Sequence, residues 1–280
     1  PSEATDHLLA AYLCGIHVLL EGPPGVGKTT LACQLGRLAG GMGRVQMSSD
    51  MQPSDLIGSE IYDSAQPDRP RFRKGPLFSP VLLVDEINRA MPRTQSALLQ
   101  AMEENKVTVG EEELSLDPFF FVIATQNPHD LEGTYLLPRS QIDRFGLRIS
   151  IAGPRGDELE AILGLHLAGV RASQNQEQIL FDLPRMREEL AELSFDGEWM
   201  RVAARLQDEL AEGGGQCLLS PRAWLHWLEL GRALSFVRGH KHLSAACLRE
   251  LLCPVFAHRL DDEGLALELP RRFDALTSRA

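Results

Sequence analysis

The stretch Gly22-Pro23-Pro24-Gly25-Val26-Gly27-Lys28-Thr29 matches the pattern G-x-x-x-x-G-K-[ST] in full. An apolar run at residues 17–20 precedes it as a predicted buried strand, and a helical pattern continues from Thr30. Glycines let backbone N–H groups turn toward a phosphate, and the N-terminus of the following helix favours anions. Residues 22–30 are therefore predicted to bind the phosphates of ATP. Lys28 would reach the β- and γ-phosphates, and the Thr29 hydroxyl would hold Mg²⁺.

A pair of carboxylates provides a second element of nucleotide chemistry. Residues 81–84 form an apolar predicted strand, and this strand ends in Asp85 and Glu86. After a phosphate loop this is the Walker B arrangement. We expect Asp85 to hold Mg²⁺, directly or through water, and Glu86 to act as general base toward the attacking water. The competing interpretation is a solvated acidic turn after a core strand.

Three further polar residues are candidates for catalysis. Asn127 follows the next predicted core strand and would bind the γ-phosphate and position the water, although Asn127-Pro128 is also a good start for a turn. Arg144 precedes the last predicted core strand. It would either be an arginine finger toward a neighbouring subunit or form a surface pair with Asp143, and the sequence spacing does not distinguish these two roles. Arg222 lies in the first turn of a predicted helix, where a cation opposes the helix dipole, and would direct a second positive charge at the phosphates.

The first half of the chain alternates short apolar runs with helical patterns, which is typical of a parallel sheet covered by helices. Strands are predicted at residues 18–20, 44–47, 81–84, 119–124 and 147–151, and helices from Lys28 to Gly40-Gly41 and over 92–105. The polar segment 53–80 contains five prolines and is expected to pack a short helix or loop against this core. Residues 106–116 alternate around a Gly-containing turn and predict a β-hairpin.

The pattern changes after Gly153. Residues 155–280 are rich in Leu, Ala, Glu and Arg and carry almost no strand signal. Helices are predicted near 155–169, 185–194, 199–212, 221–237 and 244–258, with Ser220 as a cap and Pro254 ending or kinking the last one. We therefore expect a nucleotide-binding domain over residues 1–153 and an all-α domain over 154–280.

Composition limits the partners and the compartment. The formal net charge of −11 and the pI near 5.2 argue against a nucleic-acid surface, and the basic cluster at residues 69–74 is interpreted as a solvated loop face. No apolar stretch approaches the roughly 18 residues of a membrane span, and no signal peptide is visible at the start. The five scattered cysteines are expected to be reduced thiols, so we expect a cytoplasmic protein.

Taken together, these residues resemble an AAA+ ATPase, and more narrowly the MoxR family. The strings that carry the resemblance span residues 22–223, and the most family-specific are Asp85-Glu86-Ile87-Asn88-Arg89-Ala90 and the region 133–145. The other strings are 22–29, 53–58, 74–78, 95–102, 124–128 and 220–223.

The resemblance implies an αβα AAA+ core with a helix-2 insert near 53–80, a hairpin before sensor 1 at 106–116, and an all-α lid. Asn127 would be sensor 1, Arg144 the arginine finger and Arg222 sensor 2. The active assembly would be a homo-hexamer that hydrolyses ATP between subunits. It would remodel a protein client, often a metalloenzyme, together with a protein that carries a von Willebrand factor A domain.

The chain departs from the family pattern at three places, one of which is Gln100 in place of the commoner Glu after a pair of leucines. Pro138-Arg139-Ser140-Gln141 stands where the family reads Pro-Glu-Ala-Gln, so Arg139 is a second candidate finger. The segment before the first strand is short, although family members contact adenine from there. The alternative functions are the ATPase subunit of a metal-chelatase-like complex, a nucleic-acid translocase, and a nucleotide-gated scaffold with little turnover.

Overall fold

The computed structural model describes residues 2–63, 66–128, 130, 133–154, 156, 160, 182–194, 197–212, 219–260 and 263–278. The helix predicted near 155–169 lies almost entirely outside these ranges.

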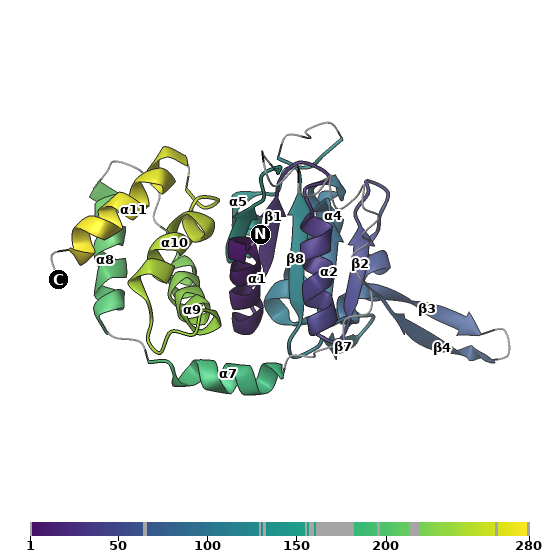
Figure 1. Cartoon of the computed structure of the whole chain (residues 1–280). Helices are drawn as coiled ribbons and strands as arrows, with labels where there is room; N and C mark the ends of the chain where they lie inside the picture. The colour runs from purple at the N-terminus through teal and green to yellow at the C-terminus, as the bar shows by residue number, and fades with distance from the viewer. Residues whose placement is uncertain are drawn as a thin grey trace.

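A parallel sheet forms the centre of the first half of the chain (Figure 1). Its five strands have the order β2-β5-β8-β1-β9. Strands that are neighbours in the sheet are therefore not consecutive in the chain, and crossover segments connect them. The parallel pairing places the carboxyl ends of all strands at one edge. The predicted α/β fold is confirmed, and each predicted strand agrees with the structure to within two residues at either end. The strands are β1 (Val18–Glu21), β2 (Met42–Gln46), β5 (Val81–Asp85), β8 (Phe121–Gln126) and β9 (Leu147–Ser150).

Alternating strand residues supply two separate cores, one on each face of the sheet. Leu83 and Ile123 pack with residues of α1 (Ser2–Cys14) and α2 (Lys28–Leu38), whereas Leu82 and Val122 pack with α4 (Pro92–Glu104). The strands read as continuous apolar runs because both faces are covered. α2 ends where predicted: Gly40 adopts a φ of 81°, and Gly41 N–H donates to the Gly36 carbonyl at 3.1 Å.

Segment 53–80 contains the predicted short helix and, in addition, a ribbon that was not predicted. A short helix, α3 (Pro53–Ile57), does form, and a turn of 3₁₀ helix, η1 (Pro76–Phe78), ends the segment. Between them lies an antiparallel ribbon of β3 (Gly58–Asp63) and β4 (Gln66–Lys74), which projects beyond β2 on the side away from the C-terminal helices (Figure 1). Prolines and charges hide a strand signal here. The pairing depends instead on Gly58, where a Cβ would lie 2.1 Å from the Arg73 carbonyl oxygen.

A second ribbon confirms the predicted hairpin. β6 (Lys106–Val109) pairs with β7 (Glu112–Ser115), and the turn includes Gly110 with a φ of 60°. This hairpin directly follows α4, with only Asn105, the cap of that helix, between them. Leu116 N–H, just after the hairpin, donates to the carbonyl of Asn105.

The described part of the second half is helical. α7 (Leu183–Glu192), α8 (Gly197–Glu212), α9 (Pro221–Val237) and α10 (Ala245–Phe256) match predicted helices, and Ser220 caps α9 by accepting from Ala223 N–H at 3.3 Å. Pro254 lies two residues before the end of α10. α11 (Glu263–Thr277) and α1 were not predicted. α1 packs between the sheet and α9, so the N-terminal helix shares its core with the C-terminal helices (Figure 1). Within the described ranges, none of the helices has the length and apolar composition that a bilayer crossing requires.

Candidate active site

The phosphate loop connects β1 to α2, and its backbone conformation requires glycine. Gly22 has a φ of 154°, and a Cβ there would lie 2.2 Å from the Ile151 carbonyl oxygen. Gly27 has a φ of 93° and is the last residue before the first turn of α2. The N-terminus of α2 therefore opens into the loop, and its unpaired N–H groups and dipole favour an anion there.

Lys28 folds back over this loop. Its Nζ donates to the carbonyl oxygens of Gly22 at 2.6 Å and Pro23 at 2.7 Å. Partial burial lowers the pKa of the Lys28 ammonium, and the charges of Asp85 and Glu86 oppose that shift. The two carbonyl oxygens therefore hold the ammonium at the phosphate loop.

Asp85 ends β5 in a group of oxygen atoms beside the loop. It is buried, and its Oδ1 accepts from Thr29 Oγ1 at 3.4 Å and from Thr125 Oγ1 at 3.3 Å. Its Oδ2 accepts from Arg44 Nε at 2.8 Å. Mg²⁺ prefers hard oxygen ligands such as carboxylate and hydroxyl. Thr29 and Asp85, the two residues predicted to hold Mg²⁺, thus place oxygen donors of this kind side by side.

Glu86 has a left-handed backbone, with φ 56° and ψ 55°, a conformation that is costly for a non-glycine residue. Its N–H donates to Thr125 Oγ1 at 3.0 Å. Its carboxylate binds Gln46 Nε2 at 2.9 Å and Arg89 Nε at 2.8 Å, and Arg89 in turn binds Asp130 at 2.7 Å. The Glu86 carboxylate therefore lies between Gln46 of β2 and Arg89.

These groups line a single cavity of about 460 Å³ at the carboxyl edge of the sheet. The predicted residues Thr30 and Asn127 line it as well, whereas Gly22, Pro23 and Val26 belong to the loop behind it. Arg44, Gln46, Thr125 and Asp130 were not predicted from the sequence. Their place in the chain could have indicated them, because polar residues at the carboxyl ends of parallel strands meet at one edge of the sheet.

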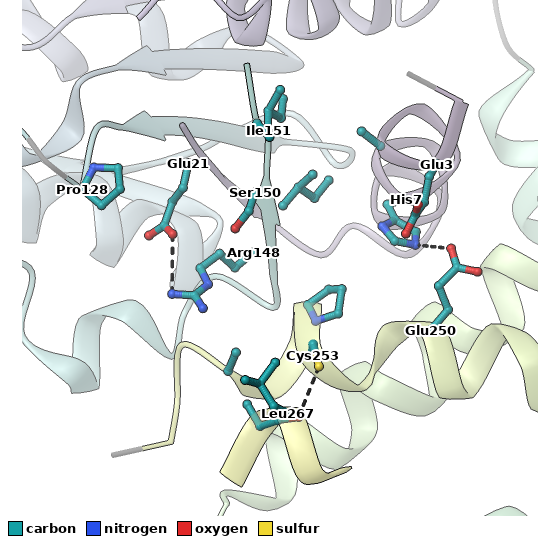
Figure 2. A pocket seen from close by; sticks show the side chains of 16 residues that line it. Glu3, His7, Glu21, Pro128, Arg148, Ser150, Ile151, Glu250, Cys253 and Leu267 are labelled. Carbon is teal, nitrogen blue, oxygen red and sulfur yellow. Dashed lines mark hydrogen bonds and ion pairs between the residues drawn. The ribbon is translucent and has the colours of Figure 1, made fainter. Parts of the chain in front are cut away.

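A second cavity of about 890 Å³ lies beside the phosphate loop (Figure 2). Ile151, whose carbonyl touches Gly22, lines it together with residues of α1, α10 and α11. Figure 2 shows its two polar sides, where Arg148 approaches Glu21 at 3.5 Å and His7 binds Glu250 at 2.8 Å. The cavity is large enough for the base and sugar of a nucleotide.

Arg144 and Arg222 lie at the opposite, amino edge of the sheet. Gly146 N–H donates to the His17 carbonyl at 3.0 Å, so the segment that carries Arg144 adjoins the start of β1. Both arginines bind Glu103 in the last turn of α4, and neither lines the two cavities. The alternative of a local Asp143–Arg144 pair is wrong. Asp143 binds Arg259 at 2.6 Å instead. The side chain of Arg139 lies outside the described residues.

Comparison with known proteins agrees with this geometry. A family model described as "ATPase family associated with various cellular activities (AAA)" matches residues 17–147. The chain is 46% identical over 158 residues to the protein YeaC of Bacillus subtilis, a match that covers 56% of this chain and 49% of that relative. It is 36% identical over 274 residues to Chaperone MoxR1 of Mycobacterium tuberculosis, covering 92% of this chain and 71% of that relative.

A solved structure shares the whole fold. A proposed ATPase from Cytophaga hutchinsonii superimposes with a TM-score of 0.83 at 28% identity, over 100% of this chain and 89% of the other. The likeness thus extends beyond the phosphate-loop core to the C-terminal helices. The predicted ATPase activity is confirmed by these relationships. The chain belongs to the MoxR family of AAA+ ATPases, and it hydrolyses ATP.

Proposed function

We propose that each subunit holds ATP in its own phosphate-loop cavity and that Arg144 and Arg222 of the next subunit complete the site in a homo-hexameric ring. The supporting observation is the placement of charge. The phosphate loop leaves the carboxyl end of β1, and the two arginines lie near its amino end. The four residues of β1 alone separate these edges by about 10 Å. Arginines in this position serve a neighbour's phosphates more readily than their own.

The residues that line the cavity would have different roles in ATP hydrolysis. Thr29 and Asp85 would hold Mg²⁺, which would neutralise negative charge on the phosphates. Lys28 would exchange its two carbonyl partners for phosphate oxygens. Glu86 would exchange one of its two side-chain donors, Gln46 or Arg89, for the attacking water and accept its proton. Asn127 would orient that water or the γ-phosphate as sensor 1.

The cavity of about 890 Å³ is the proposed place of the base and sugar. It adjoins Gly22 of the phosphate loop, and Glu3, Ala4 and His7 of α1 form one wall. In this proposal, the segment before the first strand would supply the adenine contact that the family resemblance implies. We propose that the boundary between the nucleotide-binding unit and the helical lid lies at Gly153. α1 packs against both parts.

The name of one relative, a chaperone, supports a wider role in acting on other proteins. We propose that the ring remodels a protein client in the cytoplasm, such as a metalloenzyme, with a partner that carries a von Willebrand factor A domain. A related protein is named a chaperone, and the β3–β4 ribbon projects from the core where it could meet another protein (Figure 1). The described cysteines Cys14, Cys33, Cys247 and Cys253 are free thiols, which is compatible with a reducing compartment.

Subunit mixing tests the shared site. Arg144→Ala and Lys28→Ala should each be inactive alone, because one lacks the finger and the other lacks the phosphate contact. In an equal mixture, about one quarter of the interfaces of a head-to-tail ring should combine an intact loop with an intact Arg144. Phosphate release should recover to a comparable fraction of the wild-type rate. Mixed rings that are verified by native mass spectrometry but release no phosphate would refute a role in trans.

A further inference from the structure

One carboxylate joins the two arginines that the proposed function assigns to the neighbour's phosphates. Glu103 Oε2 accepts from Arg144 Nε at 2.9 Å and from Arg144 Nη2 at 2.8 Å. Glu103 Oε1 accepts from Arg222 Nη2 at 3.1 Å. The three residues come from the end of α4, the segment before β9 and the start of α9. Glu103 therefore bridges the sheet-containing part of the chain and its C-terminal helices.

We propose that Glu103 is a positioning residue for ATP hydrolysis, which holds Arg144 and Arg222 as one cationic unit facing the next subunit's triphosphate. This inference rests on the proposed function. A guanidinium carries five N–H donors in a rigid plane. Glu103 engages two donors of Arg144 and one of Arg222, so it fixes the direction of each plane and leaves other donors for phosphate oxygens. It need not be displaced when the neighbour binds.

Local stability does not explain this arrangement. Glu103 lies in the last turn of α4 and Arg222 in the first turn of α9, and each charge opposes the dipole of its own helix. The side chains of Glu103 and Arg222 are 41% and 47% exposed, and exposed ion pairs contribute little to folding. Two charges are therefore placed against their helices for a weak contact. The geometry of the contact, in which one carboxylate holds two guanidinium groups from two parts of the chain, is what supports an orienting role.

The adjacent residue offers a matched control. Glu104 is also exposed at the end of α4, but it accepts from Gln100 within the same helix at 3.2 Å. Glu104→Gln removes the same charge from the same helix end without touching the arginines. Arg144 also stabilises the charged form of Glu103, and Arg222 adds to this, so the pKa of that carboxyl lies below its usual range. At neutral pH, Glu103→Gln therefore removes a full negative charge.

Steady-state kinetics on the full chain tests the proposal. We would measure kcat, KM and the dissociation constant of a fluorescent ATP analogue for Glu103→Gln, Glu104→Gln, Arg144→Ala and the double variant Glu103→Gln/Arg144→Ala. We expect Glu103→Gln to lower kcat about tenfold, as loss of an orienting partner typically does, and to change nucleotide affinity less than twofold. Glu104→Gln should match the wild type. The double variant should be inactive, as Arg144→Ala is, because residues that act as one unit are not additive.

Sedimentation provides the ring content, so that turnover is expressed per assembled subunit. Glu103→Asp keeps the charge and should recover part of the lost rate, which also covers the case in which Glu103→Gln folds poorly. An unchanged or raised kcat per ring in Glu103→Gln, while Arg144→Ala is inactive, would overturn the proposal. Loss of rings with normal turnover in those that remain would also overturn it. Normal turnover in Arg144→Ala would instead refute the proposed function.

Discussion

Replacing Asp143 by Asn would remove the charge that balances a buried cation between the sheet and the C-terminal helices. The side chain of Arg259, which follows α10, is 4% exposed, and its Nε donates to Asp143 Oδ1 at 2.6 Å. Its Nη2 also binds the carbonyl oxygens of Asp143 at 3.2 Å and Phe145 at 3.1 Å. Asn keeps the size of the side chain, so the main change is electrostatic.

The geometry sets the size of the effect. Removing one partner of a fully buried ion pair costs about 3–5 kcal/mol, because the other charge stays desolvated without balance. Asp143 is 28% exposed, so water and the two carbonyls compensate part of this cost. We therefore expect a loss near 3 kcal/mol, at the low end of that range. For a chain of this length, this corresponds to a fall in Tm of about 5–10 °C.

Circular dichroism melts of nucleotide-free protein at pH 7.5 measure this change. The matched control is Asp274→Asn, since the Arg249–Asp274 pair has a similar Nε contact at 2.7 Å but side chains that are 48% and 51% exposed. That variant should melt close to the wild type because exposed pairs contribute little. A change in Tm below about 2 °C for Asp143→Asn, which is under about 1 kcal/mol, would refute the reasoning from burial.

Three further outcomes are expected. Lys28→Ala should weaken ATP binding about 10- to 100-fold in calorimetric titration, since a charge-assisted contact to phosphate is lost, and unchanged affinity would contradict the assigned phosphate loop. Glu86→Gln should bind ATP but release phosphate about 10²- to 10⁴-fold more slowly, and normal release would exclude a general base at this position. Burial lowers the pKa of His17 to about 4. Between pH 6.5 and 4 the unfolded state therefore binds more protons than the folded state, so the free energy of unfolding falls as the pH decreases, by about 3 kcal/mol in total. In urea unfolding, His17→Gln should show a flatter pH dependence over this window, and an equally steep profile would refute the assignment.

The sheet could be predicted because its strands are buried on both faces. Leu82 and Leu83 point to opposite cores, so the strand appears in the sequence as an unbroken apolar run. The phosphate loop was predictable for a related reason, since its glycines and Lys28 are neighbours in the chain. In both cases the information is local, and the physical cause acts over a few residues.

The missed elements depend on contacts between distant residues. α11 contains Gly264 and Pro270, which weaken a helical signal, yet Phe273 is buried and stacks on Trp199 at 6.1 Å. Tertiary packing outweighs propensity there. The partners of Glu86 were missed for a similar reason. Gln46 lies 40 residues from Glu86 in the chain, and only the sheet order brings β2 beside β5.

Charges that oppose their helix dipoles are a sequence signal at both ends of a helix. Arg222 is a candidate from the sequence because a cation in a first turn is unfavourable, and the structure shows it bound to an anion in an equally unfavourable last turn. Each charge alone would weaken its helix slightly. Each of them, however, lies where a charge on another segment can reach it, since helix ends emerge at the edges of the sheet. The same criterion, applied to anions in last turns, selects Glu103 but also Glu104 in the same turn. The contacts of Glu103 with Arg144 and Arg222 are therefore needed to distinguish the two carboxylates.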